Sequence, residues 1–161
     1  MFLRRLKLSE FLKPGQDANA YPELPQAFKV CCISASKDPD DAEIIDWVGS
    51  IPKGERNAFK NGMGTLLKVA NAGRPLETHY DQKKCHPVHR FHHQGVEHVI
   101  WRIRAGDMRL MFYYGQGRIL LLVDSFPKYK DKLTKAQKLY AEDKVKSYLD
   151  AVNIEFTESQ Q

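Results

Sequence analysis

The chain has 161 residues, of which 42% are hydrophobic and 28% charged, a composition typical of folded proteins and not of disordered chains. This length suits one domain with its own core and no need for disulfides. No apolar run approaches about 18 residues, which excludes a transmembrane helix, and the basic N-terminus lacks the apolar core of a secretory signal. Three cysteines, two of them adjacent, are typical of free thiols. We therefore expect a cytoplasmic protein with no membrane partner.

The net charge of +5 is unevenly distributed along the chain. Residues 83–135 contain eleven lysines and arginines against four acidic residues, so this third of the chain carries a charge of +7. A basic region of this kind indicates a polyanionic partner, and a solvated basic face gives the same count. Charge alone leaves these two interpretations open.

Proline and glycine mark the organisation of the chain. Residues 1–26 are predicted to be an N-terminal extension or linker, because their second half contains three prolines and a glycine. The folded domain is predicted over residues 27–152. Residues 153–161, which are acidic, are predicted to be a flexible tail.

The folded part is predicted to begin with one strand and two helices. Residues 28–34 are rich in β-formers and predict the strand. Asp38 and Pro39 are typical of a helix start, and the apolar residues after them recur at helical spacing. A second apolar stripe, over residues 59–70, predicts a helix that ends at Gly73.

Four more strands are predicted over residues 88–93, 98–104, 108–114 and 119–123. Gly106 and Asp107 suit a two-residue turn, so these strands predict an antiparallel β-meander. A capping box at Thr134 and Gln137 predicts one last helix. The predicted fold class is α+β, an antiparallel sheet with helices packed on one face. The other face would stay open and carry three arginines: Arg102, Arg104 and Arg109.

Three segments in this order resemble the RelE/HigB branch of the RelE/ParE toxin superfamily: VIWRIR at 99–104, MRLMFYYG at 108–115 and ILLLVDSFPK at 119–128. The resemblance covers about residues 27–151. It implies a RelE-like fold, in which an N-terminal helical pair and a C-terminal helix pack on the meander. It also implies the toxin of a bacterial type II toxin–antitoxin system, acting as a metal-independent and ribosome-dependent mRNA endoribonuclease that inhibits translation.

The partners that the resemblance implies are a cognate antitoxin protein, mRNA and the ribosome, with no cofactor and no metal. Two other functions stay open. One is a ParE-like toxin that inhibits DNA gyrase without nuclease activity. The other is a non-toxic relative that binds nucleic acid or a protein partner, which the long N-terminal extension suggests. The concentration of basic residues on one predicted face favours RNA.

Metal-free RNA cleavage uses the neighbouring 2′-OH as nucleophile, and needs a base, an acid and cations that stabilise the phosphorane. Arg109 matches the strand arginine that grips the scissile phosphate in this family, and arginine binds phosphate oxygens with two N–H groups. We assign charge stabilisation to Arg102, and Lys128 and Lys130 match the basic catalytic segment of the family. His92 and Tyr113 are candidates for proton transfer. No residue matches the family's acid or base without ambiguity.

Further contacts to RNA are predicted for four basic residues: Arg90, His93, Arg104 and Lys132. A zinc site is the rival interpretation of this region, because Cys85 and four histidines crowd into nine residues. We predict no metal, since a second Cys/His pair at the spacing of a structural zinc site is missing.

Overall fold

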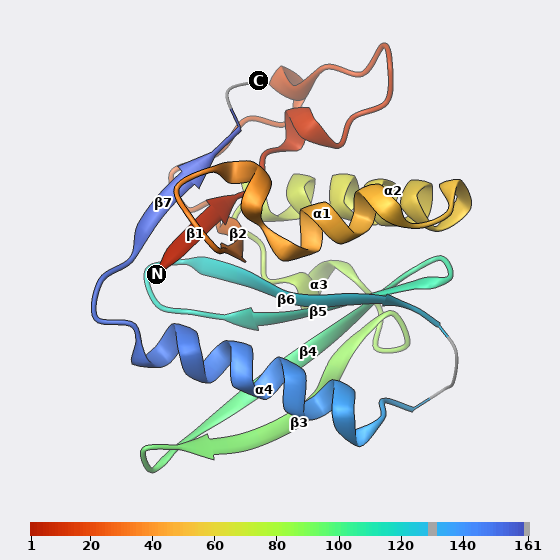
Figure 1. Cartoon of the computed structure of the whole chain (residues 1–161). Coiled ribbons are helices and arrows are strands. Elements are labelled where there is room, and N and C mark those ends of the chain that lie inside the picture. Colours follow the sequence, from red (N-terminus) through yellow and green to blue (C-terminus); the bar gives the residue numbers. More distant parts are fainter. Residues whose placement is uncertain (129–131, 160–161) are drawn as a thin grey trace.

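The computed structural model describes residues 1–128 and 132–159 (Figure 1). The strands are β1 (Phe2–Arg5), β2 (Lys29–Ser34), β3 (Cys85–His93), β4 (Val96–Ala105), β5 (Met108–Tyr114), β6 (Ile119–Pro127) and β7 (Glu155–Glu158). The helices are α1 (Glu43–Ser50), α2 (Lys53–Asn71), α3 (Leu76–His79) and α4 (Lys135–Asp150). Three short 3-10 helices cover Leu8–Glu10, Ala18–Ala20 and Pro39–Asp41.

The strands form one mixed sheet of seven strands in the order β3-β4-β5-β6-β2-β1-β7. The predicted meander is present from β3 to β6, where every neighbouring pair is antiparallel. Beyond β6 the sheet continues with β2, which is parallel to β6, and β1 and β7 are parallel to each other. The predicted fold class, a small RelE-like sheet made of this antiparallel meander, is therefore wrong, because the sheet is larger and mixed.

The helices cover both faces of the sheet, so the prediction of helices on one face is also wrong. Apolar residues of α1, α2 and α3 pack on one face in a common core. On the opposite face, Ala141, Val145 and Tyr148 of α4 pack over a second core that includes Met111 and Tyr113. The reason is physical: the face expected to be open carries large apolar side chains between its arginines, and these require cover.

The predicted N-terminal helical pair is a further correction, because the strands β1 and β2 come before α1 and α2. Residues 1–26 supply β1 and the buried side chains of Leu3, Leu6 and Leu8. Arg4 is 4% exposed and forms an ion pair of 2.6 Å with Glu10. Residues 155–158 supply β7, so the segments on either side of residues 27–152 both take part in the sheet.

Several local predictions are confirmed. The strand predicted at 108–114 is β5, and the other predicted strands overlap β2, β3, β4 and β6. The capping box is formed, since Thr134 Oγ1 accepts from the Gln137 N–H and Gln137 Oε1 accepts from the Thr134 N–H. Gly73 follows α2 with φ +74°, a conformation that favours glycine. In the part of the chain that the structure describes, no helix has the length and apolar character needed to cross a membrane.

The parallel strands β2 and β6 separate toward their carboxyl ends. They pair only between residues 29–31 and 119–121, and β6 then runs on to Pro127 while β2 stays beside β1. After β2 the chain enters α1 on one face of the sheet, and after β6 it enters α4 on the other. Open sheets bind ligands where the connections of neighbouring parallel strands leave in opposite directions.

Candidate functional site

Three exposed cations lie at the end of the sheet formed by the turn between β4 and β5: Arg104 and Lys128, which are predicted site residues, and Lys84, which is not. The Lys128 N–H donates to the Asp107 carbonyl at 2.6 Å, and the Arg104 N–H donates to the Lys84 carbonyl at 2.7 Å. The side chains of Lys84, Arg104 and Lys128 are exposed. We call these three residues the basic rim. Lys132, also exposed, lies four residues after Lys128, and Lys130 lies outside the described residues.

Arg102 and Arg109, the two predicted catalytic arginines, lie within the covered face of the sheet. Their exposed fractions are 8% and 4%. The Nη1 atom of Arg109 donates to the carbonyls of Gly106 and Met108 at 2.8 and 2.9 Å, so its guanidinium lies against the turn beside the basic rim. In this arrangement Arg109 stabilises the turn that follows Arg104 and Ala105, and its role with phosphate stays a prediction.

The predicted proton-transfer residue His92 lies at the other end of the sheet, beside the turn between β3 and β4. It is opposite Glu97 at the start of β4, whereas Arg104 is near the end of β4. At about 3.3 Å per residue, seven residues of strand separate the two positions by roughly 23 Å. The structure therefore does not bring His92 near the basic rim.

The other predicted residues at that end have protein partners. His93 Nε2 lies 2.6 Å from Asp150 Oδ1, and Arg90 forms a 3.0 Å ion pair with Glu97. Tyr113 is buried, and its hydroxyl lies 2.8 Å from His98 Nδ1. Burial raises the pKa of Tyr113. Burial together with the nearby His93 and His92 lowers the pKa of His98.

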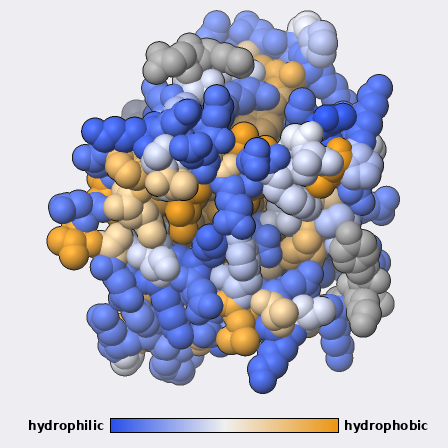
Figure 2. Space-filling model, viewed as in Figure 1, coloured by the Kyte–Doolittle hydropathy of each residue, from blue (hydrophilic) through white to orange (hydrophobic). Residues whose placement is uncertain are grey.

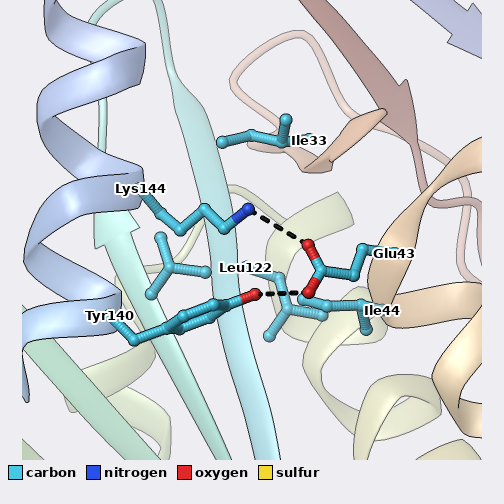
Figure 3. Close-up of a pocket in the computed structure, with 7 residues that line it drawn as sticks. Ile33, Glu43, Ile44, Leu122, Tyr140 and Lys144 are labelled. Carbon is cyan, nitrogen blue, oxygen red and sulfur yellow. Dashed lines mark hydrogen bonds and ion pairs between the residues drawn. The ribbon is translucent and has the colours of Figure 1, made fainter. Parts of the chain in front are cut away.

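A cleft that sequence reasoning missed lies where β2 and β6 separate. It has a volume of about 740 Å³ and is lined by α1, by the last residues of β6 and by the first half of α4. The side chains that bear on its chemistry are Glu43, Trp47, Asp124, Ser125, Phe126 and Tyr140. Figure 3 shows a smaller neighbouring pocket that shares Glu43, Ile44 and Tyr140 with this cleft, and in it Glu43 of α1 faces Tyr140 and Lys144 of α4. We call the larger cleft, where β2 and β6 separate, the fork cleft.

Glu43, which lines both the fork cleft and the smaller pocket, is held as an anion. Lys144 Nζ donates to Glu43 Oε2 at 3.1 Å, and the Tyr140 hydroxyl donates to Glu43 Oε1 at 3.0 Å (Figure 3). The hydrogen bond from Lys144, more than that from Tyr140, lowers the pKa of Glu43. Lys144 and Tyr140 meet the same carboxylate because positions i and i+4 share one face of a helix.

Asp124 is the second carboxyl group of the fork cleft, and its environment shifts its pKa in the opposite direction to that of Glu43. Burial raises the pKa of Asp124 to about 6. The hydrogen bond that its Oδ1 accepts from the Ser125 N–H at 2.8 Å lowers this pKa, but by less than burial raises it. The negative charge of Glu43 also raises this pKa. A β-bulge positions the group: Met111 pairs with Asp124 and Phe112 with Leu122, so Val123 is an extra residue in β6.

Aromatic side chains and one hydroxyl complete the fork cleft. Trp47 of α1, Phe126 of β6 and Tyr140 of α4 contribute rings to its lining. Ser125 is only 4% exposed, and its Oγ has no hydrogen-bond partner within the described structure. A buried hydroxyl without a partner is costly, and a bound polar group is one way to satisfy it.

On the face of the molecule seen in Figure 2, small apolar areas lie among mostly hydrophilic residues.

Metal binding receives no support from the side chains that the structure describes. Over residues 1–128 and 132–159, no group of three or more histidine, cysteine, aspartate or glutamate side chains could hold a metal ion. Cys85 is buried, and burial raises its pKa to about 12, which favours the thiol over the thiolate that metals prefer.

Comparisons of the chain with protein-family models, curated proteins and solved structures find no match.

The signal for the fork cleft was present in the sequence only as single residues. Glu43, Asp124 and Tyr140 are far apart along the chain, and no spacing rule connects them.

Proposed function

We propose that the protein is a toxin of a bacterial type II toxin–antitoxin system that cleaves mRNA without a metal, in the manner of the RelE/HigB enzymes it resembles. The observation that carries the proposal is the basic rim. Three exposed cations from separate segments of the chain lie at one end of the sheet, and one of them, Lys128, adjoins the fork cleft that contains two carboxyl groups. A cationic edge beside acid–base groups is what cleavage of a polyanion requires.

The chemistry of the basic rim supports RNA as the substrate class. Lys128 directly follows Pro127, which lines the fork cleft, so a phosphate bound by Lys128 would lie beside that cleft. Lysine and arginine contacts to phosphate give strong, sequence-independent and salt-dependent binding. We assign to Arg104 and Lys128 the binding of backbone phosphates, with Lys132 contributing to the same field.

A second candidate function is a relative that binds nucleic acid without cleaving it. The burial of Arg102 and Arg109 favours it, because a guanidinium that is 4% exposed and bonded to backbone carbonyls has little surface for a scissile phosphate. In this case the basic rim is the binding surface, and no chemistry follows. A gyrase inhibitor of the ParE type has no specific observation in its favour.

Induced expression with mapping of mRNA 5′ ends tests the proposal. The wild-type protein should arrest growth and produce new 5′ ends within coding sequences. A variant with Arg104→Ala and Lys128→Ala should lose both effects, since it lacks two phosphate contacts. The matched control carries Lys13→Ala and Lys37→Ala, two exposed lysines outside the rim, and should behave as wild type.

Two outcomes contradict the proposal. Growth arrest without new 5′ ends would mean a target other than mRNA. An absence of arrest, combined with salt-dependent RNA binding that the rim variant loses, would identify the binding-only relative instead.

A further inference from the structure

We propose that the fork cleft binds one nucleotide of single-stranded RNA and that Asp124 is the general base that activates its 2′-OH. The catalytic half of this inference rests on the proposed RNA cleavage, whereas nucleotide binding stands by itself. The predicted acid–base residues do not fill this role: His92 is at the far end of the sheet, and Tyr113 is buried against His98.

The topology of the sheet places the fork cleft where ligands bind in related architectures. It opens beyond the carboxyl ends of the parallel strands β2 and β6, between helices that leave on opposite faces. Its volume of about 740 Å³ is within the usual range of roughly 300–1,000 Å³ for small-molecule sites. A nucleotide therefore fits the position and the size of the cleft.

The lining of the fork cleft suits a nucleobase and its sugar. Trp47, Phe126 and Tyr140 offer ring faces for stacking, which every base can use. Ser125 Oγ, buried and without a partner in the described structure, can donate to or accept from a base edge. RNA recognition by unstacked bases commonly combines these two kinds of contact.

The two carboxyl groups of the fork cleft have different roles because their environments differ. Glu43 is neutralised by Lys144 and Tyr140, and is therefore a weak base. Among the described residues no cation is bonded to Asp124, which shares the cleft with Glu43 and Asp46 from α1 and Tyr140 from α4, while Lys144 of α4 acts on it only through its charge. Pairs of carboxyls whose pKa values are pushed apart mark acid–base assignments in enzymes. The more basic of the two is Asp124.

The reaction balances without a metal or a cofactor. The Asp124 carboxylate accepts the proton of the 2′-OH, and the 2′ oxygen forms a bond to the adjacent phosphorus. The bond between phosphorus and the 5′ oxygen of the next nucleotide breaks. The departing 5′ oxygen takes a proton from water, and Asp124 returns its proton to the solvent. The products are a 2′,3′-cyclic phosphate and a 5′-hydroxyl.

Two measurements on the full chain test the inference. The first is titration with adenosine 3′-monophosphate, followed by calorimetry. Wild type and Asp124→Asn should bind this nucleotide, and Phe126→Ala should bind it at least tenfold more weakly. Phe156→Ala is the matched control, because Phe156 is a half-exposed ring on β7 outside the fork cleft, and it should bind as wild type.

The second measurement is mRNA cleavage in a cell-free translation reaction. Asp124→Asn should cleave at least a hundredfold more slowly than wild type while binding the nucleotide equally well. The wild-type rate should rise with pH through about 6, as Asp124 ionises, and level off above that value. Thermal unfolding of Asp124→Asn shows that any loss is not a loss of fold.

The outcomes separate this inference from the proposed function. Cleavage by Asp124→Asn at the wild-type rate would overturn the catalytic assignment and leave the nuclease in place. Nucleotide binding that depends on Phe126, in a protein that cleaves nothing, would support the binding site and overturn the proposed function. Binding of the nucleotide that Phe126→Ala does not weaken would overturn the nucleotide site.

Discussion

Burial of the Asp124 carboxylate lowers the free energy of unfolding near neutral pH, whatever chemistry the residue performs. Its pKa rises from an ordinary value of 3.8 to about 6 in the folded protein, mainly through burial. The folded state therefore binds this proton more tightly than the unfolded state. The stability contribution of the protonated group is fully present below pH 3.8 and is lost as the pH rises through 6.

Asp124→Asn should therefore stabilise the protein near neutral pH. Asparagine keeps the acceptor for the Ser125 N–H and cannot ionise, so its free energy of unfolding should exceed that of wild type by about 1–3 kcal/mol above pH 6. Near pH 4 the two proteins should be almost equally stable. Urea unfolding of both at the two pH values measures the difference. A difference that does not change with pH would contradict the raised pKa.

Helix α2 approaches the sheet closely at Gly62. A Cβ built at Gly62 would lie 2.4 Å from the Cβ of Ala105, the last residue of β4, which is nearer than real carbon atoms approach. Glycine is thus needed at the contact between α2 and the end of β4 that carries Arg104. Gly54, in the same helix, has open space where its Cβ would be.

We predict opposite effects for alanine at these two positions of α2. Gly62→Ala should lower the free energy of unfolding by about 1–3 kcal/mol, because the helix and the sheet must move apart. Gly54→Ala should raise it by roughly 0.5–1 kcal/mol, because alanine is the better helix former. Denaturant unfolding of both variants tests the pair. Equal effects at the two glycines would mean that α2 is not seated against β4 in this way.

Helix α4 is joined to β3 by a polar contact at the sheet edge. His89 Nε2 lies 2.8 Å from Glu142 Oε1, and Lys146 also donates to Glu142 at 2.9 Å. The hydrogen bond from Lys146 first, and then that from His89, lowers the pKa of Glu142. The contribution of the ionised group is present above its ordinary value of 4.5 and is lost as the pH falls through its folded pKa.

A double-mutant cycle measures this contact between α4 and β3. With His89→Ala and Glu142→Ala, we expect a coupling energy of about 0.5–1 kcal/mol at neutral pH, since both side chains are less than a fifth exposed. The coupling should shrink well below pH 4.5, where Glu142 becomes protonated. A cycle with zero coupling at neutral pH would show that the contact between His89 and Glu142 does not help to hold α4 on β3.

At the scale of the whole molecule, local patterns predicted the elements better than their assembly. A two-residue turn at Gly106 and Asp107 requires Ile103 opposite Leu110 and Trp101 opposite Phe112, and the structure has this register. β1 and β7, at four residues each, are too short for a periodic signal. Their place in the sheet depends on pairing between chain ends, which a single sequence does not display.

The candidate site shows the same limit. The run 119–123 is apolar at every position, a pattern typical of a central strand that is covered on both faces, and this conflicts with the predicted open face. Arg102 and Arg109 are buried on the face that α4 covers, and α4 brings Tyr140 to Glu43. Asp124 enters the cleft only because of the bulge at Val123, and a β-bulge leaves no period in the sequence.

The pairing of β1 with β7 has a consequence for the order in which the sheet forms. The meander from β3 to β6 consists of neighbours along the chain, whereas Phe2 pairs with Glu155. Contacts between distant residues require closure of long loops and tend to form late in folding. We therefore expect the meander side of the sheet to assemble early from local hairpins, and the β1–β7 edge to be completed only when residues near 2 and 155 have met.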